Sequence, residues 1–260
     1  MITLENISLQ LSQKTLLDNV SMTVRKGQIT GILGANGAGK STLMKVISGE
    51  HLHYTGQVKL DEKDIKAICP VTKSMQMAYV TQHEEIYTDI NVIDYVLLGA
   101  LSCCKGNFSQ KEYQKALCAL SLLKADHFSQ KKYQQLSGGE RQRVQLARAL
   151  LQLNQHDNSY QGYLLLDEYS AHMDIYYQRQ TLQILSELVQ QHDLAVLVIG
   201  HDLNIALNFY HQSLLLKNGQ MLNFDQTQKV LTPEHIYTAF QVEADIIHRP
   251  HNNKTVIVLA

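Results

Sequence analysis

The chain has 260 residues, of which 45% are hydrophobic and 18% charged, and its formal net charge is −1. This composition supplies enough apolar side chains for a sizeable core and has too few charges for a disordered scaffold. The 23 basic and 24 acidic residues nearly cancel, so no overall positive charge favours non-specific binding to nucleic acid.

The sequence contains no segment typical of export or membrane insertion. Its first residues, MITLENISLQL, are acidic and polar where a signal peptide has a basic region followed by an apolar run. The longest apolar runs, such as LAVLVI at 194–199, are far shorter than the ~20 residues that span a bilayer. Four cysteines, at 69, 103, 104 and 118, show no CxxC pair or disulfide framework. We therefore expect reduced thiols and a cytosolic location.

The first third of the chain reads mainly as strands. Apolar and polar residues alternate over 1–25, which predicts two antiparallel strands joined by the polar turn SQK. Residues 28–34 predict a buried strand that runs through a glycine-rich turn into a helix over 40–48. A further strand pair is expected at 56–61 and 77–82.

The rest of the chain changes to helical spacing over about 91–152 and then returns to alternating strands and helices. Two entirely apolar strands in this part indicate a parallel sheet covered on both faces, and hence an α/β fold. The expected elements are a strand at 163–168, a helix at 178–190, a strand at 194–199, a hairpin at 213–224 that turns at Asn218-Gly219, a helix capped by Thr232-Pro233, and a closing strand at 255–260.

Residues 34–41, GANGAGKS, which we call the phosphate loop, fit the pattern GxxxxGK[ST] between a strand and a helix. Glycines let the backbone N–H groups of such a loop point at phosphate oxygens, and the helix N-terminus adds its positive dipole. Lys40 is expected to reach the β- and γ-phosphates and Ser41 to bind Mg²⁺. The candidate nucleotide-binding residues are Gly34, Ala35, Asn36, Gly37, Ala38, Gly39, Lys40, Ser41 and Thr42. The alternative is an ordinary glycine-rich turn.

The strand YLLLDE at 163–168 ends in two carboxylates. Asp167 is the candidate for the Mg²⁺ shell, and Glu168 for the base that polarises an attacking water. Two acids at a strand end are often only a solvated surface feature. Their position downstream of a phosphate loop favours the catalytic interpretation.

Ser137, Gly138, Gly139 and Glu140, which we call the signature turn, precede a predicted helix. Ser137 and Glu140 have the spacing of a capping box. The two glycines leave backbone N–H groups open to an anion, although glycine at this place weakens the helix. A simple helix start would explain the serine and the glutamate but not both glycines.

With LSGGE followed by RQRVQLARAL, the chain resembles the ATP-binding cassette (ABC) ATPases over nearly its whole length. The resemblance implies a single domain with the P-loop NTPase, RecA-like α/β core and an antiparallel β subdomain. The core with its β subdomain would comprise residues 1–82 and 155–230. Residues 83–154 would form the inserted α-helical subdomain with the signature turn, and 231–260 a C-terminal extension.

The resemblance also implies a homodimer. Each ATP would lie between the phosphate loop of one chain and the signature turn of the other. Gln82 matches the glutamine that touches Mg²⁺ and the water, so Ser41, Gln82 and Asp167 would surround the metal. His201 matches the histidine that contacts the γ-phosphate. Asp174 matches the aspartate of the D-loop, residues 171–174. ATP and Mg²⁺ are the implied cofactors, and Glu168, His201 and Gln82 the catalytic residues.

Several positions depart from the family pattern. The aromatic residue that usually stacks on adenine falls at Leu11, which leaves discrimination among nucleotides in doubt. Tyr169-Ser170 replaces the usual Pro-Thr after the catalytic glutamate. Because the two carboxylates and Asp174 are kept, we expect hydrolysis to persist. A cassette that binds ATP but hardly turns over is the alternative.

Within the family the chain is most similar to importers of haem, siderophores and cobalamin, and most of all to the haem (hemin) importer ATPases. HDLNIAL at 201–207, the insertion NQHDNSYQG and the ending VLTPEHIYTAFQVEADIIHRP carry this similarity. The implied partners are a second copy, two membrane permease subunits and, indirectly, a substrate-binding protein, at the cytoplasmic face of the inner membrane. ALSC at 100–103 replaces an Arg-x-Pro-His segment of many relatives, so siderophore or cobalamin import stays open. A cassette acting on DNA or ribosomes is disfavoured, because the chain has neither a long coiled coil nor a second cassette.

The twelve histidines are scattered along the chain. The closest pairs, His51 with His53 and His248 with His251, lack further ligands at zinc spacing. We expect surface or packing roles for them.

Overall fold

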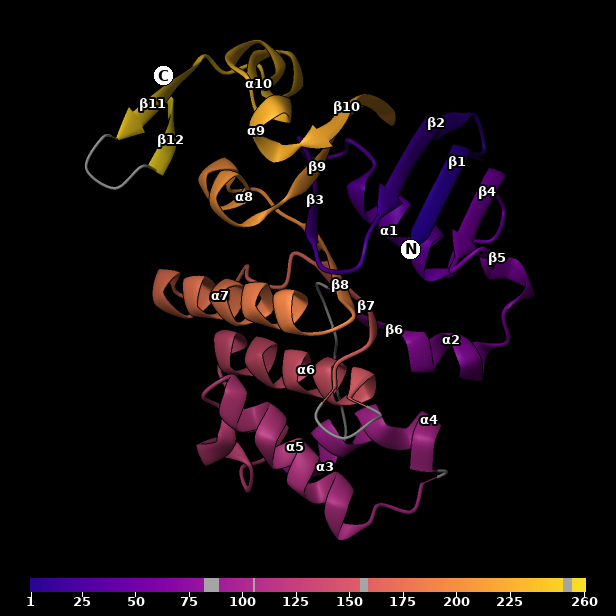
Figure 1. Ribbon diagram of the computed structural model, residues 1–260, viewed down its shortest axis with the longest axis vertical. Coiled ribbons are helices and arrows are strands. Elements are labelled where there is room, and N and C mark those ends of the chain that lie inside the picture. The colour runs from indigo at the N-terminus through magenta and orange to yellow at the C-terminus, as the bar shows by residue number, and fades with distance from the viewer. Residues whose placement is uncertain (82–88, 105, 155–158, 250–253) are drawn as a thin grey trace. The chain divides into compact units, whose positions relative to one another are not determined.

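A computed structural model of the chain describes residues 1–81, 89–104, 106–154, 159–249 and 254–260. The chain divides into two compact units (Figure 1). Unit 1 comprises Met1–Ile68 and Leu197–Ala260, and unit 2 comprises Cys69–Val196. Mixed strands and helices confirm the predicted α/β class.

Unit 1 begins with the antiparallel strands β1 (Ile2–Leu11) and β2 (Lys14–Val24), as the sequence predicts. β1 pairs on its other side with β4 (Thr55–Leu60), which also pairs with the short β5 (Lys63–Asp64). The expected pairing of 56–61 with 77–82 is wrong. Both segments contain strands, but the hydrogen-bonding partners of β4 are β1 and β5, which already occupy both of its edges.

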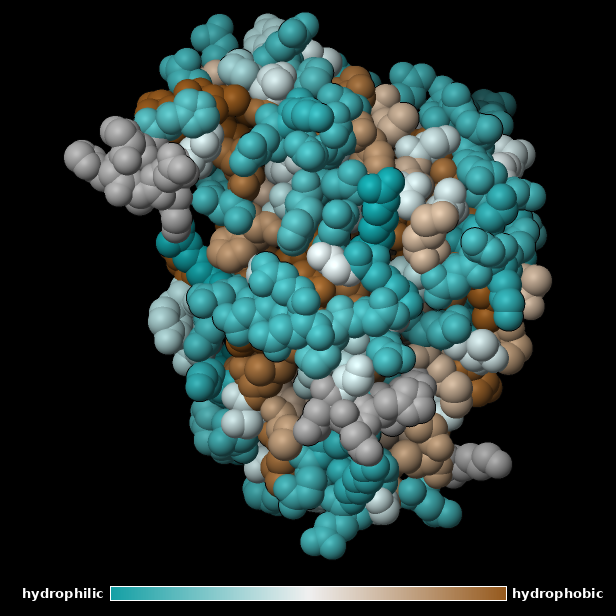
Figure 2. All heavy atoms as spheres, in the orientation of Figure 1, coloured by the Kyte–Doolittle hydropathy of each residue, from teal (hydrophilic) through white to brown (hydrophobic). Residues whose placement is uncertain are grey.

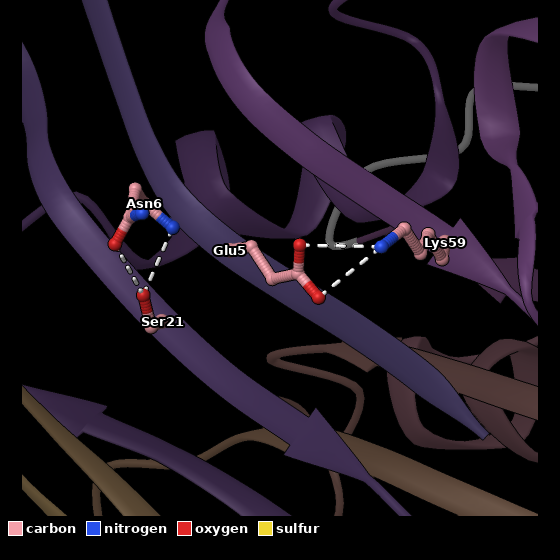
Figure 3. A network of polar contacts seen from close by, with 4 residues as sticks. All are labelled: Glu5, Asn6, Ser21 and Lys59. Atoms are coloured by element: carbon pink, nitrogen blue, oxygen red, sulfur yellow. Dashed lines mark hydrogen bonds and ion pairs between the residues drawn. The ribbon is translucent and has the colours of Figure 1, made fainter.

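Side-chain hydroxyls stabilise two irregular points in the β1–β2 pair. Asn6 and Asn19 adopt positive φ values of 52° and 54°. The backbone N–H of Asn6 donates to Ser21 Oγ over 2.9 Å, and that of Asn19 donates to Ser8 Oγ over 2.8 Å. Figure 3 shows the first of these contacts beside an ion pair that joins Glu5 of β1 to Lys59 of β4. Polar contacts thus hold the exposed face of this antiparallel sheet.

The buried strand β3 (Ile29–Gly34) leads to helix α1 (Lys40–Ser48), as predicted. β3 runs parallel to β9 (Gln212–Lys217), with Ile32 opposite Leu214. β9 forms the predicted hairpin with β10 (Gln220–Gln226), and β10 continues the sheet to β2. Asn218 and Gly219 have φ values of 50° and 80°, as a two-residue turn between strands requires.

The C-terminal part of unit 1 contains helices α8 (Leu203–Phe209), α9 (Thr227–Val230) and α10 (Pro233–Phe240). Thr232 Oγ1 accepts a hydrogen bond from the N–H of His235, and Pro233 is the first residue of α10, which confirms the predicted cap. The predicted last strand is β12 (Lys254–Leu259). It pairs with β11 (Ala244–Arg249), which the sequence analysis did not predict.

Unit 2 contains the predicted helical run. Its helices include α3 (Val92–Leu97), α4 (Leu101–Cys104), α5 (Gln110–Leu122) and α6 (Gly138–Leu153), and 3-10 turns lie at Leu98–Ala100, Asp126–Phe128 and Tyr133–Gln135. Helices α5 and α6 pack side by side (Figure 1). The rings of Tyr95 and Tyr133 lie 4.6 Å apart in this part of the core, and Arg148 Nε donates to the Tyr95 hydroxyl over 3.1 Å.

The same unit holds α2 (Pro70–Gln76), β6 (Met77–Val80), β7 (Gly162–Asp167) and α7 (Ile175–Gln191). β6 runs parallel to β7, and every residue of β7 is buried, as predicted for a covered parallel strand. Strand β8 (Leu194–Ile199) is also buried throughout. Its residues up to Val196 belong to unit 2, and those from Leu197 onward belong to unit 1. The outer face of α7, with Arg179, Gln183 and Glu187 exposed, forms a hydrophilic surface (Figure 2).

Across the described ranges, no helix is both long and apolar enough to cross a bilayer. The four cysteines, all in the described part of the chain, are free thiols.

Candidate functional site

The phosphate loop connects β3 to α1, and its shape depends on glycine. Gly34, Gly37 and Gly39 have φ values of 149°, 79° and 104°, which L-residues rarely adopt. A Cβ atom on Gly34 would lie 2.3 Å from the carbonyl oxygen of Leu216, and one on Gly39 would lie 2.8 Å from that of Leu16. Neighbouring strands therefore press against the loop and leave room only for a bare backbone at these two positions.

Lys40 is the first residue of α1 and is buried. Its Nζ donates to the carbonyl oxygens of Gly34 and Ala35 over 2.8 and 3.0 Å, so the ammonium group lies across the mouth of the loop. In α1, all of whose residues are described, no acidic side chain lies in the first turn and no side chain caps it. The N–H groups of this turn, together with Lys40, can therefore bind an anion such as a phosphate group.

His201 lies beside the end of β3 within unit 1. The N–H of the preceding residue, Gly200, donates to the carbonyl oxygen of Ile32 over 3.3 Å. Asp202, the next residue, caps α8 by accepting from the N–H of Ile205 over 2.9 Å. His201 is exposed between these two hydrogen-bonded residues.

A buried tyrosine fixes the backbone beneath this histidine. A Cβ atom on Gly31 or Gly200 would lie within 2.3 or 2.6 Å of the Tyr210 side chain, so both glycines make room for it. Burial raises the pKa of the Tyr210 hydroxyl, with a smaller contribution from Asp202. Tyr210 therefore stays neutral and acts as a packing element in this part of unit 1.

In unit 2, strand β7 ends at Asp167, and Glu168 follows it. Asp167 is 5% exposed, and its Oδ2 accepts a hydrogen bond from the hydroxyl of Tyr79 over 3.3 Å. Glu168 has a positive φ of 49°, an unfavourable value for a side chain of this type. Residues held in such conformations are concentrated at functional sites. The sequence identifies both carboxylates but gives no sign of the strain or of Tyr79.

The signature turn begins α6 with the predicted capping box. The N–H of Ser137 donates to Glu140 Oε2 over 2.7 Å, and the N–H of Glu140 donates to Ser137 Oγ over 3.4 Å. The hydrogen bond from the Ser137 backbone holds the pKa of the Glu140 carboxyl below its usual range. Ser137 and Gly138 are exposed, so the turn faces outward from unit 2.

The signature turn and the D-loop are in direct contact, which the sequence analysis did not foresee. A Cβ atom on Gly138 would lie 2.9 Å from His172 Cβ, and one on Gly139 would lie 2.8 Å from the carbonyl oxygen of His172. Asp174 caps α7 by accepting from the N–H of Tyr177 over 3.0 Å. Besides leaving backbone N–H groups open, the two glycines thus allow the D-loop to pack closely against the start of α6.

The predicted site residues therefore fall into two groups. In unit 1 the structure brings together the phosphate loop, Thr42 and His201. In unit 2 it brings together the signature turn and the D-loop, while Asp167 ends β7 and Glu168 follows it. Gln82 lies outside the described residues. Leu11, in the expected place of an aromatic ring, ends β1 and is 53% exposed.

Comparison with known proteins gives a consistent result. Residues 17–171 match the family described as ABC transporter. The hemin import ATP-binding protein HmuV of Pseudomonas entomophila is 36% identical over 251 residues, which cover 96% of each chain. The protein of the same name from Bordetella avium is 32% identical over 257 residues, or 98% of this chain and 97% of that one.

A solved structure described as the dimeric structure of MJ0796, a bacterial ABC transporter cassette, is also similar. It superimposes with a TM-score of 0.76 at 25% identity, and the match covers 87% of this chain and 99% of that one. The phosphate loop, the signature turn and this similarity in sequence and fold agree. The chain belongs to the ABC transporter family and has the P-loop NTPase fold of its ATP-binding cassettes.

Proposed function

We propose that this chain is the ATP-hydrolysing subunit of an importer that carries hemin across the cytoplasmic membrane. The observation that carries the ATPase proposal is the phosphate loop. Neighbouring strands leave room only for glycine at Gly34 and Gly39, and Lys40 Nζ donates to the carbonyl oxygen of Gly34. Support for hemin comes from relatives named for hemin import, which align over 96–98% of this chain.

The chemistry of the site divides among these residues. Residues 34–42 bind the phosphate groups, and Lys40 stabilises the charge that develops on the transferred phosphoryl group. Glu168 accepts the proton of the attacking water, and His201 contacts the γ-phosphate. Gln82 is proposed to touch the water and the metal by resemblance alone.

The donor set fits Mg²⁺, because the cation prefers oxygen ligands such as hydroxyls and carboxylates. Ser41 and Asp167 supply these two kinds of oxygen, and Gln82 would supply an amide oxygen. The nearly buried Asp167 carboxylate accepts a hydrogen bond from the Tyr79 hydroxyl, which supports this proposed role. When bound, Mg²⁺ neutralises charge on the β- and γ-phosphates.

We further propose that two copies assemble head to tail. Ser137, Gly138 and Asp174 are exposed in unit 2, where a second chain can reach them. The dimeric form of the similar MJ0796 cassette supports this arrangement. Two permease subunits would then dock on the helical subdomain at residues 83–154, with a substrate-binding protein outside. The core at 1–82 and 155–230 and the extension at 231–260 complete the proposed single domain, peripheral to the inner membrane.

Weak hydrolysis is the second candidate. An exposed leucine cannot stack on adenine as a ring does, which favours a loosely held nucleotide. Tyr169, in place of the usual proline, directly follows Glu168 in the chain and is 3% exposed. A steady-state rate separates this candidate from the main proposal.

The ATPase proposal is tested by phosphate release from the full chain and its Glu168→Gln variant. We expect the substitution to slow release by at least about 100-fold, because it removes the general base. Glu187→Gln, on the exposed face of α7, is the matched control and should keep the wild-type rate. Equally low rates in the wild-type and Glu168→Gln chains would instead support the weakly hydrolysing cassette.

The substrate is tested with the membrane subunit that copurifies with the chain, reconstituted with it in liposomes. ATP-dependent accumulation of hemin, with none of cobalamin or a ferric siderophore, is the expected result. Accumulation of either of the others without hemin would reassign the importer.

A further inference from the structure

Two hydrogen bonds join the side chain of Gln142, in the second turn of α6, to the D-loop residue His172. The N–H of His172 donates to Gln142 Oε1 over 3.2 Å, and Gln142 Nε2 lies 3.2 Å from His172 Nδ1. Because Oε1 already accepts from the backbone, the amide group has its NH₂ end toward the ring. His172 Nδ1 is therefore the acceptor of the second hydrogen bond, and the proton of the neutral ring lies on Nε2.

The backbone approach at the signature turn strengthens this connection. The Cβ atom of His172 occupies the space that a side chain on Gly138 would need, and the carbonyl oxygen of His172 occupies that of a side chain on Gly139. The contact therefore has a steric part, which the glycines permit, and a polar part, which Gln142 supplies. Together they fix the D-loop against the first two turns of α6.

The other end of the D-loop is tied to Glu168. The N–H of Ala171 donates to the carbonyl oxygen of Glu168 over 3.2 Å, and Gln178 Nε2 donates to Ser170 Oγ over 2.9 Å. Asp174 begins α7 directly after the loop. Hydrogen bonds and close packing thus connect Glu168 through the D-loop residue His172 to the signature turn, entirely within unit 2.

We propose that His172 is a positioning residue that joins the signature turn to the D-loop, so that the signature turn and Asp174 meet the partner's nucleotide as one body. This inference rests on the proposed head-to-tail dimer. His172 itself is exposed whereas Gln142 is 7% exposed. Losing the ring therefore leaves a nearly buried amide donor without its acceptor, at little cost in apolar packing. The consequence falls on assembly and turnover more than on folding.

The test uses the full chain carrying Glu168→Gln, in which bound ATP is retained long enough to measure dimer formation by sedimentation. Adding His172→Leu should weaken ATP-dependent dimerisation about tenfold, because the D-loop is no longer held against α6 in the position that meets the partner. His172→Asn should restore most of the loss, because its Oδ1 can accept from Gln142 at the place of Nδ1. His53→Leu, at an exposed position of unit 1, is the matched control.

Two further measurements separate positioning from damage to the fold. With Glu168 intact, His172→Leu should lower kcat about tenfold while the Kd of a fluorescent ATP analogue for the monomer stays unchanged and the thermal Tm falls by only about 2–4 °C. Gln142→Leu should reproduce the effect, and the double variant should lose no more than either single one.

Dimerisation of His172→Leu equal to that of its Glu168→Gln parent would overturn the inference and leave the proposed function standing. Equal losses in His172→Leu and His172→Asn would also overturn it, because the acceptor would then be irrelevant. If the Glu168→Gln parent itself formed no dimer with ATP, the proposed dimer would fail, and the inference with it.

Discussion

The phosphate loop and the signature turn both begin a helix with glycines, but the structure holds them by different means. In the phosphate loop the glycines have positive φ values, and carbonyl oxygens of Leu16 and Leu216 exclude a side chain. In the signature turn Gly138 and Gly139 are helical, and the D-loop excludes the side chain. The first helix has no side-chain cap, whereas Ser137 and Glu140 cap the second.

This difference separates two kinds of binding surface. Strands of its own unit shape the phosphate loop, so it is complete within one chain. The signature turn is already capped by its own side chains and faces outward next to the D-loop. Such a surface is suited to complete a site on another molecule, as the proposed dimer requires.

The largest expected effect concerns the phosphate loop. Lys40→Met should lower phosphate release by about 100- to 1000-fold, because it removes a preorganised positive charge from the developing phosphoryl group. Lys45→Met, an exposed lysine near the end of the same helix, provides the control and should leave the rate unchanged. A Lys40→Met chain that hydrolyses ATP at the wild-type rate would show that the loop does not carry the chemistry.

Two glycines of the phosphate loop distinguish backbone strain from steric exclusion. Gly37→Ala should lower the free energy of unfolding by about 1–2 kcal/mol, because alanine is strained at positive φ but meets no atom within 4 Å. Gly39→Ala has the same strain and in addition meets the backbone of Leu16, so we expect a loss above about 3 kcal/mol. Denaturant unfolding measures both; equal losses would mean that the neighbouring strands do not shape the loop.

In the signature turn the same substitution should separate binding from turnover. Gly139→Ala favours the helix by up to about 1 kcal/mol but displaces the D-loop at His172. We therefore expect kcat to fall about tenfold or more while the chain keeps its affinity for ATP and its stability. Loss of ATP affinity in the isolated chain would contradict the division between the two surfaces.

The smallest effect is on pH dependence at the signature turn. Because the folded state lowers the pKa of Glu140, its stabilising effect is present above the pKa of the unfolded chain and is lost as the pH falls through the folded pKa. The protection factor for hydrogen exchange at the start of α6, which corrects for the pH dependence of intrinsic exchange, should therefore be high at neutral pH and fall only in acid. Glu140→Gln should remove this pH dependence, and an unchanged profile would argue against the capping box as its cause.

Local sequence patterns predicted much of this structure. The glycine-rich turn between a strand and a helix at 34–41, the Ser137–Glu140 capping box, the Asn218-Gly219 turn and the Thr232-Pro233 helix start were all confirmed, because each depends on residues a few positions apart. The resemblance added the family and the D-loop, which local spacing alone does not give.

Contacts between distant segments could not be predicted in this way. The partners of β4, the His172–Gln142 pair and the Tyr79–Asp167 hydrogen bond join residues that lie 30 to 88 positions apart or belong to different strands. The positive φ of Glu168 could not be predicted either, because glutamate rarely adopts this conformation and nothing in the local sequence indicates it. Such features depend on tertiary packing, which overrides local preference.

The central claim is that one chain's phosphate loop works with the other chain's signature turn, and mixing two inactive variants tests it directly. Lys40→Met and Gly139→Ala chains should each hydrolyse ATP slowly alone. In mixed dimers one site would contain both substitutions and the other neither, so an equimolar mixture should recover about one quarter of the wild-type phosphate release. A mixture no more active than the average of its two components would contradict the account.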